Sequence, residues 1–190
     1  MAKRELKPHE VITGEVRLSY VHIWEAHAVK DGETPKYSAQ LIIPKTDTVT
    51  IAAVNEAIQA AYNDGKDKLK GKSTAAPALE TLKTPLRDGD LEKPDDEDYA
   101  GAYFMNANSS DPVGVVDRAN VKITDRSQIY SGVYAKAFVG FFAYNTNGGK
   151  GIACGLNHVQ KLRDGTPLGG KGNAEDVFDV EEVDDDDVIF

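Results

Sequence analysis

One stretch of the chain places flat aromatic rings and a positive charge at alternate positions. Between Ile129 and Tyr144, one parity is mainly aliphatic or small, and the other holds five aromatic residues and a lysine. The second set consists of Tyr130, Tyr134, Lys136, Phe138, Phe142 and Tyr144. Bases of a single-stranded nucleic acid stack on such rings at roughly 1–3 kcal/mol each, while lysines and arginines bind the phosphates. The pattern predicts a binding surface of this kind on the outer face of a long strand.

The alternative for the same rings is burial under a second layer of the fold. We expect burial more readily for Phe138 and Phe142 than for Tyr130 and Tyr134. Trp24 and Tyr20 share one parity of an earlier alternating stretch, and each could belong to the core or to a stacking platform.

Lysines suited to phosphate binding gather between Lys66 and Lys83, a segment rich in lysine, glycine, alanine and threonine that indicates a mobile basic loop. The predicted site combines three stacking aromatics with six cations. These residues are Trp24, Tyr130 and Tyr134, with Lys66, Lys68, Lys70, Lys72, Arg87 and Lys136. Affinity should fall as salt rises, because each phosphate contact releases counterions.

The acidic segment from Asp88 to Asp98 offers a different chemistry. Asp88, Asp90 and Asp95 are carboxylates of the kind that hold a divalent metal in a nuclease, whereas a solvated acidic loop needs no ligand. Lys93 stands where a calcium-binding loop would have glycine, which favours the solvated loop. The four histidines lack metal-ligand spacing, and Cys154 is expected in the core. We therefore expect no metal, no cofactor and no catalysis.

Charge is distributed unevenly along the chain. There are 22 basic and 31 acidic residues, a net charge of -9, but nine of the acids fall between Glu175 and Phe190. The remainder is neutral, with 22 residues of each sign. Without the Asp88–Asp98 segment as well, the rest has 21 basic and 15 acidic residues, net +6. A basic face is therefore permitted despite the overall acidity.

Hydrophobic periodicity indicates a mainly β fold with one clear helix. Alternating strands are expected over 11–24 and 36–43, joined as a hairpin, and Thr46 or Asp47 can cap a helix that fades near Gly65. Further strands are expected over 103–107, 113–116, 129–144 and 151–159. The length fits one domain, residues 1–173, followed by a tail. A single cysteine and the lack of a long apolar stretch point to a cytosolic protein.

The predicted tail, residues 174–190, is acidic and has an apolar end. The end consists of Asp184, Asp185, Asp186, Asp187, Val188, Ile189 and Phe190. Carboxylates without a base cannot pack together, so this segment should be disordered. An apolar tip suits the pocket of a partner, and the acids can compete with nucleic acid for a basic groove of the same chain. The alternative is a solubilising tail with no partner.

Five short segments are familiar in combination: Leu86 to Asp90, Pro94 to Gly101, Phe104 to Asn108, Tyr130 to Tyr134 and Gly151 to Asn157. Together they resemble a family of bacteriophage single-stranded-DNA-binding proteins that was long classified as a domain of unknown function. The resemblance covers roughly residues 10–173. It implies an OB-fold, a five-stranded Greek-key barrel with one main helix and long inserted loops.

The same resemblance implies single-stranded DNA binding in phage replication or recombination, in the cytoplasm of the bacterial host and without catalysis. The tail is similar in kind to the acidic, phenylalanine-ended tails of bacterial and phage single-strand binders, through which replication and recombination proteins are recruited. It departs from the bacterial form because Ile189 stands where that form has proline. A metal-dependent nuclease, a DNA-mimicking interaction protein and self-association stay open as alternatives.

Overall fold

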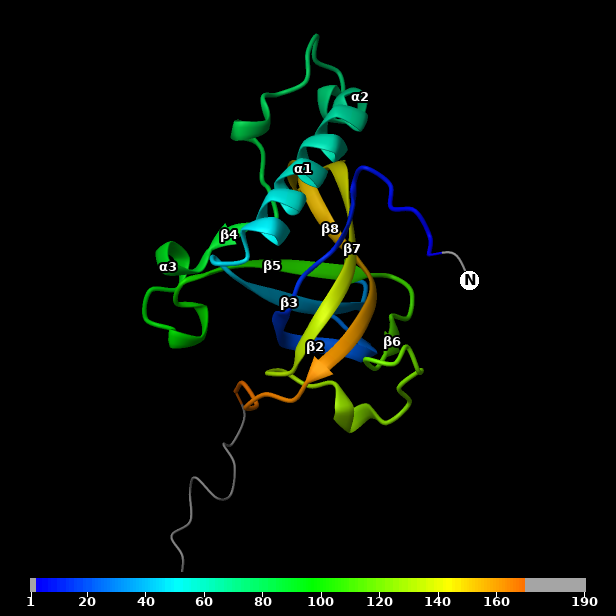
Figure 1. Ribbon diagram of the computed structural model, residues 1–190. Coiled ribbons are helices and arrows are strands. Elements are labelled where there is room, and N and C mark those ends of the chain that lie inside the picture. Colours follow the sequence, from blue (N-terminus) through cyan, green and yellow to red (C-terminus); the bar gives the residue numbers. More distant parts are fainter. Residues whose placement is uncertain (1–2, 170–190) are drawn as a thin grey trace, which may run out of the picture.

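Five strands form a closed barrel in the computed structural model, which describes residues 3–169 (Figure 1). The strands are β2 (Val16–His27), β3 (Lys36–Pro44), β5 (Ala102–Ser109), β7 (Tyr134–Thr146) and β8 (Gly149–Arg163). They pair in the order β2-β3-β5-β8-β7, and β7 pairs again with β2. Every pair is antiparallel except β5 with β8. This topology confirms the expected OB-fold.

Shorter elements decorate the barrel. Strand β1 (Glu10–Ile12) pairs with β7, β4 (Arg87–Asp88) pairs with β5, and β6 (Gly114–Val116) pairs with β8. The helices α2 (Lys66–Lys70) and α3 (Gly89–Glu92) are short, as are the 3-10 turns Leu79–Thr81, Glu97–Tyr99 and Arg126–Gln128. In Figure 1, α2 lies at one end of the barrel and α3 at its side.

The expected helix is α1 (Thr48–Asp64), and its predicted ends are confirmed. Asp47 is the N-cap, and its carboxylate accepts hydrogen bonds from the backbone N–H (3.0 Å) and the hydroxyl (2.6 Å) of Thr50. The Thr50 hydroxyl in turn accepts from the backbone N–H of Gly14, between β1 and β2. Buried side chains such as Val54 and Ile58 face the barrel, so the cap also fixes the helix against the sheet.

The alternation predicted for the long strand is confirmed, although the strand begins later than expected. The inner parity from Val133 to Ala143 is buried. Residues 129–133 are not part of β7, because the chain turns at Gly132, where φ is +114°. A Cβ at this position would lie 2.2 Å from the carbonyl oxygen of Thr166, so only glycine fits.

Two segments differ from their predicted character. The lysine-rich segment is not a mobile loop throughout, because Leu69 of α2 is fully buried and Asn145 Nδ2 donates to the carbonyl of Lys68. The acidic segment is likewise more than a solvated loop. It holds β4, α3 and a 3-10 turn that buries Tyr99. One buried side chain explains each correction, because Leu69 fixes the lysine-rich segment to the barrel and Tyr99 fixes the acidic one.

The seam between β5 and β8 is the shortest strand pairing of the barrel. These strands share a single registered pair, Asn108 with Gly155. Beside it, the backbone N–H of Ile152 donates to the carbonyl of Lys83, so the segment before β4 fills part of the gap. Cys154 lies near this seam and is buried, as predicted, and burial raises the pKa of its thiol.

The predicted tail, residues 174–190, and its boundary at residue 173 lie outside the described residues. Among the helices of residues 3–169, no helix is long and apolar enough to cross a membrane.

The Asp47 cap generates a stability prediction. Replacing it in Asp47→Ala leaves the first-turn N–H of Thr50 without its partner and should lower the free energy of unfolding by about 1 kcal/mol. Urea denaturation measures the change, and Glu56→Ala on the exposed face of α1 is the control. Equal losses in the two variants would show that the cap contributes nothing specific.

Candidate nucleic-acid interface

A bulge in β2 turns Tyr20 out of the barrel. The β2–β3 register shifts between Ser19 and His22, and Tyr20 has a φ of +46°, unusual for a residue with a side chain. Before the bulge Leu18 is buried, and after it the buried position is Ile23, so the inward parity has reversed. Tyr20 is 61% exposed as a result. Backbone strain of this kind gathers at functional sites.

Tyr20 borders a groove on the outer face of β3 and β5. A hollow of about 540 Å³ runs along this surface. We call this surface the β3–β5 face. The residues that line its hollow include Tyr20, His22, Ser38, Gln40, Arg87, Lys93, Phe104, Asn106 and Asn108. In OB-folds the second and third barrel strands, with the loops beside them, bind oligonucleotides. Here those two strands are β3 and β5.

Cations lie over the aromatic rings of the β3–β5 face. The Lys93 ammonium is 3.9 Å from the ring centroid of Tyr99 and 5.3 Å from that of Tyr20. The Arg87 guanidinium lies 4.9 Å from the ring centroid of Phe104 and pairs with Glu92. Lys93 is the one basic residue of the acidic segment, and it lies in the lining of the groove.

The groove continues across the β5–β8 seam to a second exposed ring. Asn106 and Asn108 line both the first hollow and a neighbouring one of about 710 Å³, which reaches Phe142, Lys36 and Lys83. Among residues 3–169, no ion pair involves either lysine. This hollow extends the surface toward the β7–β8 turn.

Phe142 is 52% exposed, whereas Tyr130 and Tyr134 are half-buried, so the expectation that Phe142 is buried more readily than these tyrosines is wrong. Its cross-strand neighbour is Ala153, and a Cβ on Gly155 would lie 3.7 Å from its ring. These neighbours are too small to cover the phenylalanine ring. Each end of the groove therefore carries an exposed aromatic ring, Tyr20 at one and Phe142 at the other.

Two imidazoles stack at the β2–β3 hairpin beside the groove. The ring centroids of His22 and His27 are 4.2 Å apart, with planes 10° from parallel. Burial lowers the pKa of His22 below its ordinary value, and the neighbouring His27 lowers it further. Proton uptake by His22 is therefore disfavoured.

The predicted aromatic residues lie elsewhere and already have partners. The ring of Tyr134 is 3.6 Å from the Arg163 guanidinium, and the Tyr130 hydroxyl donates to Asp164. Trp24 is half-buried against the core, and its indole N–H donates to the carbonyl of Ile129. All three brace segments around the start of β7 and the end of β8.

The predicted cations fall in three places. Arg87 lies on the β3–β5 face, and Lys136 projects from β7 opposite Gln160. The lysines of the α2 region, Lys66, Lys68, Lys70 and Lys72, lie beside the β7–β8 turn, to which α2 is tied through Asn145. That turn is roughly 40 Å along β7 from Tyr134. The predicted set therefore does not form one surface.

Two of the three acidic residues suggested for a metal site are engaged by a lysine. The Lys45 ammonium lies 2.8 Å from Asp88 and 2.7 Å from Asp90. This ion pairing raises the pKa of Lys45 and lowers that of Asp90, which also accepts from the backbone N–H of Gly101. Within residues 3–169, no group of three or more metal-ligating side chains is gathered.

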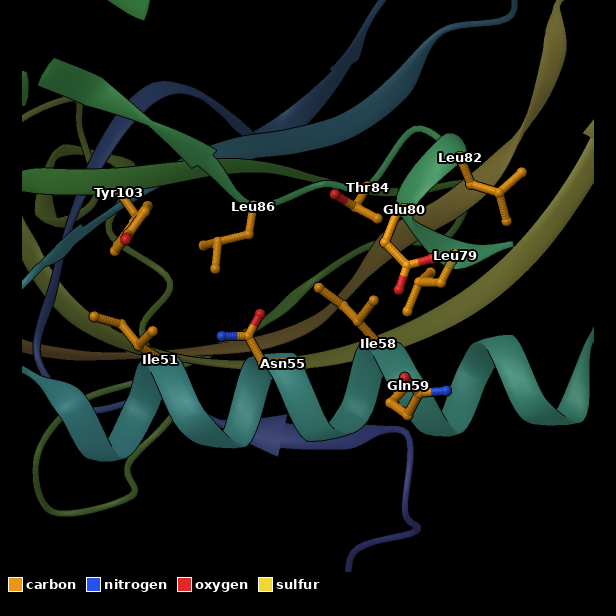
Figure 2. A pocket seen from close by; sticks show the side chains of 10 residues that line it. All are labelled: Ile51, Asn55, Ile58, Gln59, Leu79, Glu80, Leu82, Thr84, Leu86 and Tyr103. Carbon is orange, nitrogen blue, oxygen red and sulfur yellow. The ribbon is translucent and has the colours of Figure 1, made fainter. Parts of the chain in front are cut away.

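A separate hollow lies between α1 and the segment before β4, as Figure 2 shows. Its volume is about 490 Å³. Leucines and isoleucines from both sides line it, together with Asn55, Gln59 and Glu80. Its lining shares no residue with the β3–β5 face, and Thr84 alone lines both it and the second hollow of the groove.

Sequence reasoning left Tyr20 open between core and stacking platform, and it missed Lys93 and the asparagines of β5 as site residues. The bulge that exposes Tyr20 leaves no sign in the hydrophobic pattern. Asn106 and Asn108 did carry a signal, since polar residues alternate there with buried Met105 and Ala107. Polar residues on the third strand of an OB barrel point to its binding face.

The fold and this groove define an OB-fold protein with a surface of the oligonucleotide-binding kind. The chain belongs to the family of the Enterobacter phage Enc34 single-stranded-DNA-binding protein, whose model matches residues 9–189. The expected membership is confirmed. The family's description is that of a binding protein rather than an enzyme.

Individual relatives agree with this assignment. The chain is 33% identical to putative protein p50 of Acyrthosiphon pisum secondary endosymbiont phage 1 over 175 residues, 90% of each chain. The Enc34 protein, solved in complex with single-stranded DNA, has a TM-score of 0.71 at 23% identity, covering 88% of this chain and 97% of that one. The single-stranded-DNA-binding protein gp2.5 of bacteriophage T7 has a TM-score of 0.58 at 17% identity, covering 85% and 90%. These structural likenesses show a shared fold.

The stacked histidines generate a prediction about stability and pH. Because the pKa of His22 is lower in the folded protein, the unfolded chain binds more protons as pH falls through about 6.5, and stability is lost. His22→Gln should therefore lose less stability than the wild type between pH 7 and pH 5. Urea midpoints at the two pH values measure this, with His9→Gln as the control. The same loss in wild type and His22→Gln would contradict the assignment.

Proposed function

We propose that this protein binds single-stranded DNA with little sequence preference and protects it during phage DNA replication and recombination. The observation that carries the proposal is the groove on the β3–β5 face, with an exposed aromatic ring at each end. Membership in a family described as single-stranded-DNA-binding supports it. So does the Enc34 protein's structure in complex with single-stranded DNA.

Stacking on the two exposed rings supplies sequence tolerance. Every base has a flat face, so Tyr20 and Phe142 can each accept any base. Between them the lining is polar, with Asn106 and Asn108 beneath the path of the strand. A chain of nucleotides that spans both rings would cross the β5–β8 seam.

Cations along the groove suit the phosphates. Lys93 and Arg87 lie at the Tyr20 end, and Lys36 and Lys83 lie at the Phe142 end. The lysines of the α2 region lie beside the β7–β8 turn, where they extend the positive potential beyond Phe142. We retain Tyr130, Tyr134 and Lys136 as a predicted secondary path, although Tyr134 would have to share its ring with Arg163.

The alternatives of a different class gain less support. In a nuclease that used Asp88, Asp90 and Asp95, a metal would have to displace Lys45 from two of the three carboxylates. A DNA-mimicking interaction protein would have no affinity for DNA, and a titration separates it from our proposal. We place the activity in the cytoplasm of the bacterial host during infection.

The aromatic ends of the groove give the first test. Tyr20→Ala and Phe142→Ala should each weaken binding of a labelled oligothymidine roughly 5- to 150-fold, the equivalent of one lost base stack at 1–3 kcal/mol. Fluorescence anisotropy at one fixed salt concentration measures the dissociation constants. Val121→Ala, which removes an exposed apolar side chain outside the groove lining, is the matched control.

Tyr134→Ala in the same titration compares the two predicted surfaces. If it weakened binding while Tyr20→Ala and Phe142→Ala did not, DNA would follow β7 and the β3–β5 face would be the wrong site. No change of anisotropy for the wild type at low salt would remove the function itself.

The lysines without ion pairs predict a salt effect. Lys83→Gln should reduce the slope of log affinity against log salt by about 0.7, the share of one phosphate contact with a single strand. Lys45→Gln, whose native ammonium is already bound by two aspartates, should leave the slope nearly unchanged. Titrations over a salt series measure both, and equal slopes for Lys83→Gln and wild type would contradict a phosphate contact.

The acidic tail is proposed to compete with DNA and to recruit replication or recombination proteins through Val188, Ile189 and Phe190. Truncation after Asn173 removes all nine acids of the last sixteen residues and should raise DNA affinity. The gain should be largest at low salt, where charge repulsion is least screened. Anisotropy titrations of the full chain and the truncation measure it. An unchanged affinity would leave the recruiting role alone.

A further inference from the structure

A buried hydrogen-bond network lies directly beneath the β3–β5 face. Tyr99 is 2% exposed and Gln40 is 6% exposed, and the tyrosine hydroxyl donates to Gln40 Oε1. Gln40 Nε2 then donates to Asn106 Oδ1 over 2.9 Å. The chain of bonds runs from the acidic segment through β3 to the exposed side chain of Asn106 on β5.

The tyrosine fixes which way both amides point. A phenol has one proton to donate, and the acceptors near it are Gln40 Oε1 and Ser19 Oγ, the latter at 3.5 Å. If Gln40 were reversed, the hydroxyl would accept from Nε2 and its own proton would have only the distant serine. Such a buried, poorly satisfied donor is costly. The Gln40 amide therefore directs Nε2 toward Asn106.

Asn106 must then present its donors to the groove. Its oxygen is occupied by Gln40, so the Nδ2 hydrogens face the space above β5. Asn108 lies two residues further along the same face, and no hydrogen bond fixes its amide among residues 3–169. One asparagine is a donor of fixed polarity, and its neighbour is free to rotate.

We propose that Asn106 donates a hydrogen bond to a base carbonyl and that the Tyr99–Gln40 pair acts as its positioning group. This inference rests on the proposed function. Adenine is the one DNA base without a carbonyl, and its acceptors are ring nitrogens. The N7 and N1 acceptors lie beside the exocyclic amino group, a donor that asparagine pairs with only through its amide oxygen. That oxygen of Asn106 is engaged by Gln40, so the amino group opposes the Nδ2 donor. Binding remains tolerant of sequence because stacking dominates, but the groove disfavours adenine relative to thymine.

The test compares oligothymidine and oligoadenine of equal length on the full chain at one salt concentration. The quantity is the ratio of the two dissociation constants, adenine over thymine. Self-stacking of oligoadenine affects every variant equally, so it cancels when ratios are compared between variants. Asn106→Ala should lower the ratio about 3- to 10-fold, the worth of one hydrogen bond of 0.7–1.4 kcal/mol.

Tyr99→Phe tests the positioning role without touching a group that faces DNA. It removes only the buried hydroxyl, after which the two amides can reverse, so the ratio should fall toward that of Asn106→Ala. Asn108→Ala is the matched control: it should weaken binding of both oligonucleotides by the same factor and leave the ratio unchanged. Circular dichroism checks that each variant is folded.

Three results would overturn the inference. An unchanged ratio in Asn106→Ala would show that the amide does not read the base. A ratio that rises in Asn106→Ala would show that the oxygen, not the nitrogen, faces DNA. An unchanged ratio in Tyr99→Phe would remove the positioning role. In each case wild-type binding to oligothymidine would still stand, whereas failure of the wild type to bind either strand would refute the proposed function itself.

Discussion

Strand β7 imposes the constraint on which the rest of the molecule depends. It pairs with β8 from Tyr134 to Thr146 and also with β2, which closes the barrel. Because side chains alternate along a strand, filling the core with one parity forces the other parity outward. Each outer ring then meets a different environment. Arg163 covers Tyr134, Arg4 lies 5.3 Å from the ring of Phe138, and Phe142 is left open.

Much of the fold could be predicted because local rules agreed with the final packing. The cap at Asp47, the β2–β3 hairpin and the inner parity of β7 follow from capping chemistry and periodicity. The site was less accessible to prediction. Tyr20 is exposed by one backbone bulge, and the cover over Tyr134 comes from an arginine 29 positions later in the chain. Neither effect is encoded in the pattern of the strand that carries the ring.

The acidic segment shows that charge alone is a poor guide to function. Its many carboxylates suggested a metal site or a solvated loop, and its single lysine appeared as an interruption. In the fold, the carboxylates of Asp88 and Asp90 hold Lys45, the adjoining Tyr99 is buried in the barrel wall, and Lys93 reaches the groove. The segment therefore serves the binding face through its few non-acidic residues.

The short seam between β5 and β8 has a mechanical meaning. One registered pair, Asn108 with Gly155, joins the two strands, so the shortest pairing of the barrel lies under the middle of the groove. A DNA strand stacked on both Tyr20 and Phe142 would cross this pairing on the outer surface of the barrel. The bound DNA would then help to hold β5 and β8 together, where the protein backbone does so least.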